Sequence, residues 1–110
     1  MPERKYTPLI LAYCARNRID VPPPFERHPA SRYAVVRLDT TPPKLSAKTF
    51  FKKEDLQYYL RSKAGELGAA DAASLPLRVL DVKNAVELVV GPDGRTSPGS
   101  QLALSVHQEP

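Results

Sequence analysis

The stretch Lys53–Leu67, KEDLQYYLRSKAGEL, decides the fold class of this 110-residue chain. Its apolar residues recur at spacings of three and four, which predicts an amphipathic helix. Glu54 and Asp55 lie in the first turn, where the helix dipole favours negative charge, and Gly68 is a natural stop. The helix face that this spacing predicts to be buried comprises Leu56, Tyr59, Leu60, Lys63 and Leu67.

Segments on both sides of this helix have the composition of β-strands. Residues 33–39, YAVVRLD, and 77–82, LRVLDV, are rich in aromatic and β-branched side chains. Residues 45–51 fit either a short strand or an extended lead-in to the helix. A helix between strand segments of this kind indicates the α+β class.

The region that follows, 82–90, fits two structures. Its valines suit a strand after a turn at Lys83-Asn84, since asparagine tolerates a left-handed backbone, but they also recur at helical spacing. We prefer the strand because valine has a high β-propensity. The GPDG sequence at 91–94 predicts a turn, so 102–106 is expected to be the returning strand.

The first half of the chain contains one further helix and an unusual amount of proline. The helix is predicted over 9–19, with Thr7 as its cap and Pro8 at its favoured first position. Its buried face is expected to comprise Leu11, Cys14, Ala15 and Arg18, with Ile10 beside them. The chain has 12 prolines, and their density predicts that 21–31 is an extended segment, partly polyproline II.

These elements combine into one small α+β domain over 1–110. Two helices are expected to pack on one face of a small, mostly antiparallel sheet of three to five strands. The proline-rich extended segment, 21–31, is expected to lie over a surface of this domain. Residues 68–75 are expected to form a linker of small residues with little tendency to pack.

No residue pattern in the sequence is typical of an enzyme or a metal site. Cys14, His28 and His107 have no metal-ligand spacing, and we interpret Cys14 as a core residue rather than a nucleophile. The glycine-rich stretch 91–99 lacks the Gly-Lys-Ser/Thr end of a phosphate loop. We therefore predict a non-catalytic protein without metal or cofactor; an enzyme that uses Cys14 or a histidine is a weaker alternative.

The cysteine content and the apolar runs bear on the compartment. A single cysteine excludes an internal disulfide and suits a reducing compartment. The longest apolar run, 8–15, is too short to span a bilayer. We predict a protein of the cytoplasm or an organellar matrix that has no membrane partner.

The formal net charge of +4 is unevenly distributed along the chain. Residues 1–53 contain 11 Lys/Arg against 4 Asp/Glu, whereas 54–110 contain 5 against 8. This asymmetry predicts a basic surface on the first half, although lysines and arginines also serve simply to solvate loops. The predicted basic set comprises Arg4, Lys5, Arg16, Arg18, Arg27, Arg32, Lys44, Lys48, Lys52 and Lys53.

These features favour a binding function. The leading hypothesis is an accessory subunit of a larger assembly, or a small inhibitor that docks on one, through the basic, proline-rich first half. The alternative is a nucleic-acid-associated domain that contacts phosphates through the same surface, although no nucleic-acid-binding motif is present. Rings expected to stack on bases in that case are Tyr6, Tyr13, Phe25 and Tyr33. The VPPPF sequence at 21–25 fits a rigid spacer better than a peptide motif held by a partner.

Overall fold

Five antiparallel strands form the centre of the molecule. A computed structural model describes residues 6–23, 25 and 32–102. Its elements in chain order are α1 (Tyr6–Arg16), β1 (Tyr33–Arg37), β2 (Lys44–Phe50), α3 (Lys53–Leu67), the short 3-10 helix η2 (Ala72–Ser74), β3 (Leu77–Asp81), β4 (Val86–Val90) and β5 (Thr96–Gln101). The strand order in the sheet is β2-β1-β3-β4-β5, and each neighbouring pair is antiparallel. The predicted α+β class, with two helices packed on an antiparallel sheet, is therefore confirmed.

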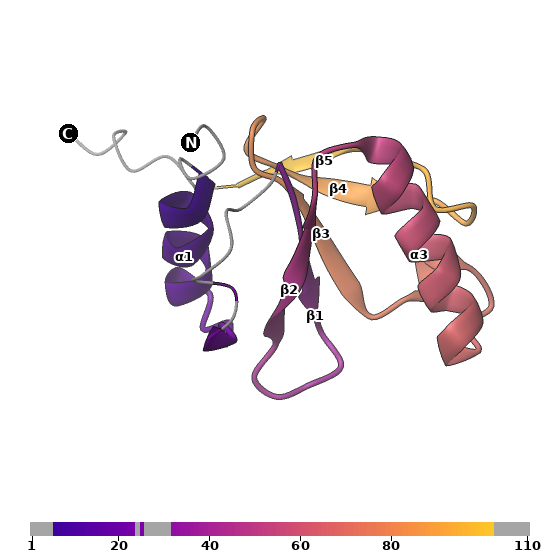
Figure 1. Ribbon diagram of the computed structural model, residues 1–110, viewed down its shortest axis with the longest axis horizontal. Helices are drawn as coiled ribbons and strands as arrows, with labels where there is room; N and C mark the ends of the chain where they lie inside the picture. Colours follow the sequence, from indigo (N-terminus) through magenta and orange to yellow (C-terminus); the bar gives the residue numbers. More distant parts are fainter. Residues whose placement is uncertain (1–5, 24, 26–31, 103–110) are drawn as a thin grey trace.

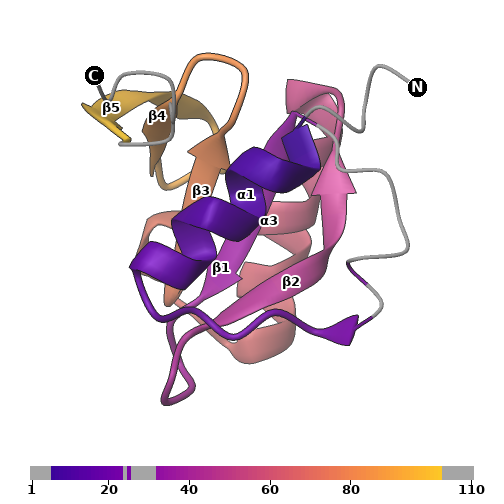
Figure 2. The same cartoon turned by 90° about the vertical axis from the view of Figure 1, so that its left-hand side faces the viewer.

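The two helices lie on opposite faces of this sheet, so the prediction that both cover one face is wrong (Figure 1). Ala34 and Val36 of β1 point into a core with α1, while Tyr33 and Val35 point into a core with α3. Figure 2 shows the same layers, with α1 in front of the sheet and α3 behind it. The reason is that all four residues are buried, and a strand with two apolar faces needs a covering layer on each side.

Helix α1 is shifted relative to its prediction, and it buries a different face. It includes Tyr6 and ends at Arg16, so Thr7 lies inside the helix and is not its cap. The buried side chains are Ile10, Tyr13 and Cys14, and the predicted face was wrong in including Ala15 and Arg18, which are exposed. Tyr13 is favoured for burial because its ring is large and its hydroxyl accepts a hydrogen bond from Arg78 Nη1 at 3.0 Å.

Helix α3 begins and ends where the sequence predicts. Gly68 follows it in the left-handed conformation, with φ of 68°, and its N–H donates to the carbonyls of Ala64 and Gly65. The fully buried stripe is narrower than the predicted one, because Tyr59 and Lys63 are half-buried and Leu67 is exposed. The buried side chains of α3 are Leu56, Leu60 and Ala64.

The small-residue linker at 68–75 is packed, contrary to its prediction. Ala72 and Leu75 are buried, and the Ala72 N–H donates to the Pro92 carbonyl at 3.1 Å. Asp71 caps η2, because its Oδ1 accepts hydrogen bonds from the N–H and the hydroxyl of Ser74. Alanine and leucine side chains thus supply enough apolar contact for this segment to join the core on the α3 side.

The last strands resolve the ambiguities of the second half. The strand that we preferred for residues 82–90 is confirmed as β4. Of the two alternatives for 45–51, the structure shows the strand, which is β2. The left-handed residue in the turn before β4 is Ala85, with φ of 55°, and not Asn84. The returning strand was predicted too late: β5 begins at Thr96, because the Gly91–Gly94 turn is tight and Val90 already pairs with Thr96.

The described part of the proline-rich segment connects α1 to the sheet edge. Asp20 forms an isolated parallel bridge with Lys44, and the Phe25 ring is buried in the α1-side core. Residues 24 and 26–31 of the predicted extended segment lie outside the described residues, as do 103–106 of the predicted last strand. Of the helices that the structure describes, none is both long and apolar enough to cross a membrane.

Candidate functional site

The described members of the predicted basic set come from three parts of the chain. Arg4, Lys5 and Arg27 lie outside the described residues, and Arg16 and Arg18 are at the end of α1. Arg32 is held at the start of β1, and the remaining four members lie along β2 and at the start of α3. These four are Lys44, Lys48, Lys52 and Lys53, which are exposed and have no ion pair within the described part of the chain.

Arg32 has a structural role. Its Nε and Nη2 atoms donate to the two carboxylate oxygens of Asp81, each at 3.0 Å, and Asp81 is only 2% exposed. Asn84 adds hydrogen bonds from its backbone N–H and its side-chain amide. Burial alone would raise the pKa of Asp81, but the hydrogen bonds from Arg32 and Asn84 outweigh burial and lower this pKa. The Arg32 side chain thus joins the start of β1 to the end of β3.

A groove of about 410 Å³ lies between the second half of β2 and the first turns of α3. Its floor is made by Phe50 at the end of β2 and Tyr59 in the second turn of α3, whose ring centroids are 5.1 Å apart at an interplanar angle of 51°. We call it the aromatic groove, and its lining residues are Lys48, Thr49, Phe50, Phe51, Asp55, Tyr58, Tyr59 and Ser62.

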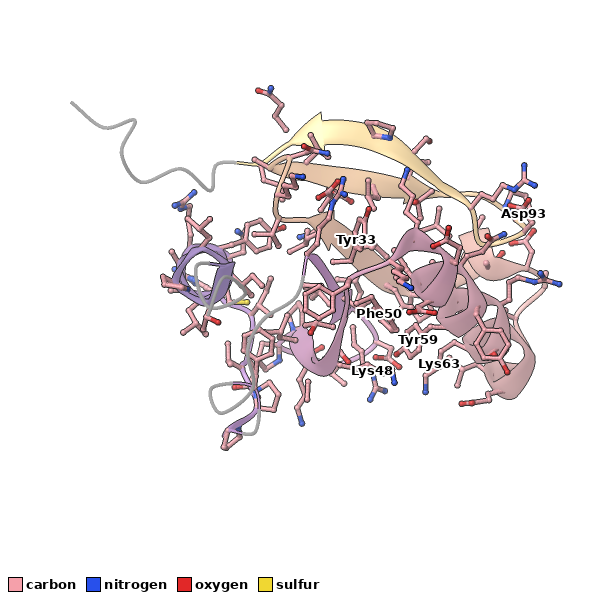
Figure 3. All side chains as sticks on the ribbon, turned by 45° about the horizontal axis from the view of Figure 1, so that its top comes forward. Tyr33, Lys48, Phe50, Tyr59, Lys63 and Asp93 are labelled. Carbon is pink, nitrogen blue, oxygen red and sulfur yellow. The ribbon has the colours of Figure 1, made fainter. Side chains whose placement is uncertain are left out.

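Two lysines flank the rings on the floor (Figure 3). The Lys48 ammonium lies 5.6 Å from the centroid of Phe50, and the Lys63 ammonium lies 5.8 Å from the centroid of Tyr59. Both distances are within the range of cation–π attraction. Lys63 also pairs with Glu66 at 3.3 Å, one turn along the same helix. The positive charge of Lys63 is thus partly neutralised by Glu66, whereas Lys48 has no carboxylate partner among the described residues.

Two further rings of the groove stand in solvent. Phe51 is 58% exposed and Tyr58 is 74% exposed, although both border a cavity that apolar side chains line. Each follows or precedes a ring of the floor in the sequence: Phe50-Phe51 and Tyr58-Tyr59. Because consecutive residues point in different directions in strands and helices, one member of each pair is turned inward and the other outward. These doubled aromatics are the sequence signal that the prediction of the site missed.

The rings predicted to stack on nucleic acid are, by contrast, core residues. Tyr13, Phe25 and Tyr33 are all buried: the first two belong to the core on the α1 side of the sheet, and the third to the core on the α3 side. The side chain of Tyr6 lies outside the described part of the structure. The prediction that these four rings together form a stacking surface is therefore wrong, because the three described ones are buried.

Tyr59 also borders a neighbouring cavity of about 200 Å³. The lining of this cavity is mixed, because the Arg37–Asp39 ion pair, Ser46 and Lys63 lie beside the exposed Leu67. The two cavities together follow the α3-facing side of β2, from its middle to the far end of the helix. The candidate site is thus an elongated surface with Tyr59 at its centre.

The described residues hold no arrangement for metal binding or nucleophilic catalysis that we can identify. Cys14 is fully buried, and burial raises the pKa of its thiol to about 11, so it remains neutral at physiological pH. His28 and His107 lie outside the described residues. Within the described ranges, no group of three or more His, Cys, Asp or Glu side chains is placed to hold a metal ion.

Comparison with known proteins gives no match: no family model, no curated protein and no solved structure is similar to this chain. Its function is therefore inferred from the geometry and the charges of the aromatic groove.

Proposed function

We propose that this chain is a non-catalytic binding protein, an accessory subunit of a larger protein assembly or a small inhibitor that docks on one. The observation that supports this most strongly is the exposure of Phe51 and Tyr58 beside an apolar groove. Burial of apolar surface stabilises a protein by about 25 cal/mol per Å². Rings that stay in solvent beside a cavity do not contribute this stabilisation to the free chain. Exposed apolar patches of this kind mark interaction sites.

The composition of the groove suits a protein partner. Aromatic side chains are enriched at the centres of protein interfaces, and charged ones are found at their rims. Here the rings of Phe50 and Tyr59 form the floor, Lys48 and Asp55 are the charged residues of the lining, and Lys52 and Lys53 precede and begin α3. The unpaired lysines would speed association with an acidic partner and fix its orientation. This retains the predicted role of the basic first half, but only for the members of the set that lie along β2 and α3.

Nucleic acid is the second candidate, because exposed rings beside lysines also form a stacking platform for single strands. Asp55 lines the groove, however, and Glu54 precedes it in the first turn of α3. A nucleic-acid strand carries a phosphate at every nucleotide, and both carboxylates would repel these phosphates. The surface therefore suits a protein, whose acidic groups can lie beside Lys48 and away from Asp55, better than a nucleic-acid backbone.

We further propose that the protein works in a reducing compartment, the cytoplasm or an organellar matrix. The support is its free cysteine, which is kept in the core and has no thiol partner in the chain.

The test is capture of partners from a lysate of the native host with the tagged chain, with and without nuclease. The variant combines Phe51→Ser with Tyr58→Ser, and the matched control is Val89→Ser. Val89 is 57% exposed, and as the neighbour of the inward-facing Leu88 it projects from the opposite face of the sheet. We expect one defined protein, recovered near one-to-one after nuclease, to be lost with the groove variant and kept with the control.

Three outcomes would count against the proposal. Capture that nuclease abolishes would establish the nucleic-acid alternative. Equal capture by the groove variant and the control would remove the groove from the interface. Residue-dependent turnover of a substrate by the isolated chain would contradict a non-catalytic role.

A further inference from the structure

The aromatic groove opens beside an edge of the sheet, and this edge is poorly suited to adding a strand. β2 is the outermost strand, and at its start the Leu45 N–H already donates to the Asp20 carbonyl at 2.8 Å. Farther along, its register with β1 shifts, and the Lys48 N–H is bonded to the Ser46 hydroxyl. Bulges and lysines on edge strands oppose pairing with a further strand. An occupant of the groove is therefore held through side chains rather than a main-chain ladder.

The floor of the groove selects an apolar anchor. Its volume of about 410 Å³ falls within the range of roughly 300–1,000 Å³ that is usual for ligand pockets. The tilted rings of Phe50 and Tyr59 offer faces and edges to a ring or a branched aliphatic chain. Phe51 and Tyr58 each adjoin one of these rings in the sequence, line the same cavity, and would be covered by the same occupant.

The groove lining holds one cation, Lys48, and one anion, Asp55, so a carboxylate of the occupant is favoured on the Lys48 side. The Lys48 ammonium lies over the Phe50 ring, whereas Lys52 and Lys53 precede and begin α3 outside the lining, and Lys53 borders another cavity. None of these three ammonium groups has a carboxylate partner among the described residues. A carboxylate next to Lys48 would be attracted to the ammonium, and the neighbouring rings would strengthen this attraction because they exclude part of the water around the pair.

We infer that the occupant of the aromatic groove is an acidic peptide segment of the partner, in which an aromatic, leucine or methionine anchor is flanked by Asp or Glu. This inference rests on the proposed function and specifies the chemistry of the partner at that same site. The anchor fills the space over Phe50 and Tyr59, and a flanking carboxylate pairs with Lys48.

The experiment is selection of random peptides displayed on phage against the full chain, followed by fluorescence anisotropy with the synthetic consensus peptide. We expect consensus sequences with one apolar anchor and at least one adjacent acidic residue. Lys48→Glu should weaken binding of that peptide by about tenfold or more, because it turns an attraction into a repulsion. Tyr58→Ser should weaken it similarly. Lys83→Glu, a charge reversal of an exposed lysine in the turn before β4, is the control and should change it less than about twofold.

Several results would overturn the inference. These are failure to select any peptide, a basic or uncharged consensus, binding unaffected by Lys48→Glu, or tighter binding of a mixed-sequence single-stranded oligonucleotide in the same assay. If nuclease-resistant capture still depended on Phe51 and Tyr58, the proposed function would stand and only the acidic-peptide chemistry would fall. If that capture also failed, both would fall together.

Discussion

The two faces of the sheet are built differently. On the α1 side, Ile10, Tyr13 and Cys14 are buried together with the Phe25 ring, and the layer is closed. On the α3 side, Leu56 and Leu60 close an equally buried core, yet rings remain in solvent where the helix meets the edge strand β2.

Helix α3 therefore has two roles: one stripe of its side chains covers the sheet, and the neighbouring stripe lines the aromatic groove. A single stripe of α3 is sufficient to cover the sheet, so side chains on the neighbouring stripe are free of the packing requirement. Tyr58 occupies that neighbouring stripe and Tyr59 lies at the boundary. Changes in the closed regions should therefore alter stability, and changes in the aromatic groove should alter binding alone.

The largest effects should come from truncation of a fully buried side chain on either face. Ile10→Ala on the α1 side and Leu60→Ala on the α3 side should each lower the free energy of unfolding by about 2–5 kcal/mol, since each leaves a cavity. Urea denaturation followed by circular dichroism measures both. A change below about 1 kcal/mol in one variant would show that its face is not a packed layer.

A somewhat smaller effect, with a defined pH dependence, is expected at Asp81. Asp81→Asn should lower the free energy of unfolding at pH 7 by about 1–3 kcal/mol, because Arg32 loses its charged partner. The pKa of Asp81 is lowered in the folded state, so its contribution is complete above the unfolded-state pKa and is lost as pH falls through the folded-state pKa. The wild-type protein should thus lose stability between about pH 5 and about pH 2, and the variant should lose less.

Asp39→Asn is the control for this measurement. Its pKa is also lowered, by the hydrogen bond and charge of Arg37, but the pair is exposed and screened by solvent. An equal loss of pH dependence in both variants would contradict a special role for the buried pair.

A gain in stability is expected in the turn before β4. Ala85 has a φ of 55°, a left-handed conformation that disfavours residues with a Cβ by roughly 1–2 kcal/mol. Ala85→Gly removes this strain, although glycine loses roughly 0.5–1 kcal/mol more in chain entropy, so a net gain of up to about 1 kcal/mol should appear as a higher urea midpoint.

Gly94→Ala should have the opposite effect. Gly94 has a φ of 87°, and a Cβ there would lie 3.0 Å from the Gln57 carbonyl oxygen and from Arg61 Cγ. Destabilisation by Ala85→Gly, or none by Gly94→Ala, would contradict the backbone conformations of these turns.

The smallest effect on stability should come from the aromatic groove. Tyr58→Ser removes a ring that is mostly in solvent, so the free energy of unfolding should change by less than about 0.5 kcal/mol. Thermal and urea unfolding measure this. A loss comparable to that of Leu60→Ala would mean that the ring belongs to the core and not to a binding surface.

The local patterns were sufficient to predict α3, the central strands and the α+β class. Leu56 and Leu60 recur at helical spacing, and Gly68 supplies the left-handed stop. The two-sided burial of β1 was missed, although the unbroken apolar run YAVV was its signal.

The site was harder to predict because it depends on which side chains the fold leaves uncovered. The prediction placed Lys48 and Arg32 in one basic surface because both lie in the first half of the sequence. The side chain of Arg32, however, pairs with Asp81, 49 residues away. Likewise the doubled pair Tyr58-Tyr59 indicates that one of its rings faces solvent, but not which one, and it says nothing of whether Phe25 and Tyr33 are buried. Long-range contacts make that distinction, and they form only when the sheet and both helices are in place.

The most direct test of the binding surface is amide hydrogen exchange, measured by mass spectrometry, on the chain alone and in complex with its captured partner. We predict slower exchange in the complex over 46–59, the outer part of β2 and the first turns of α3, and unchanged exchange over α1. Slowed exchange confined to α1, or to β4 and β5, with none over 46–59, would contradict the account, because it would place the partner on a region that we describe as closed.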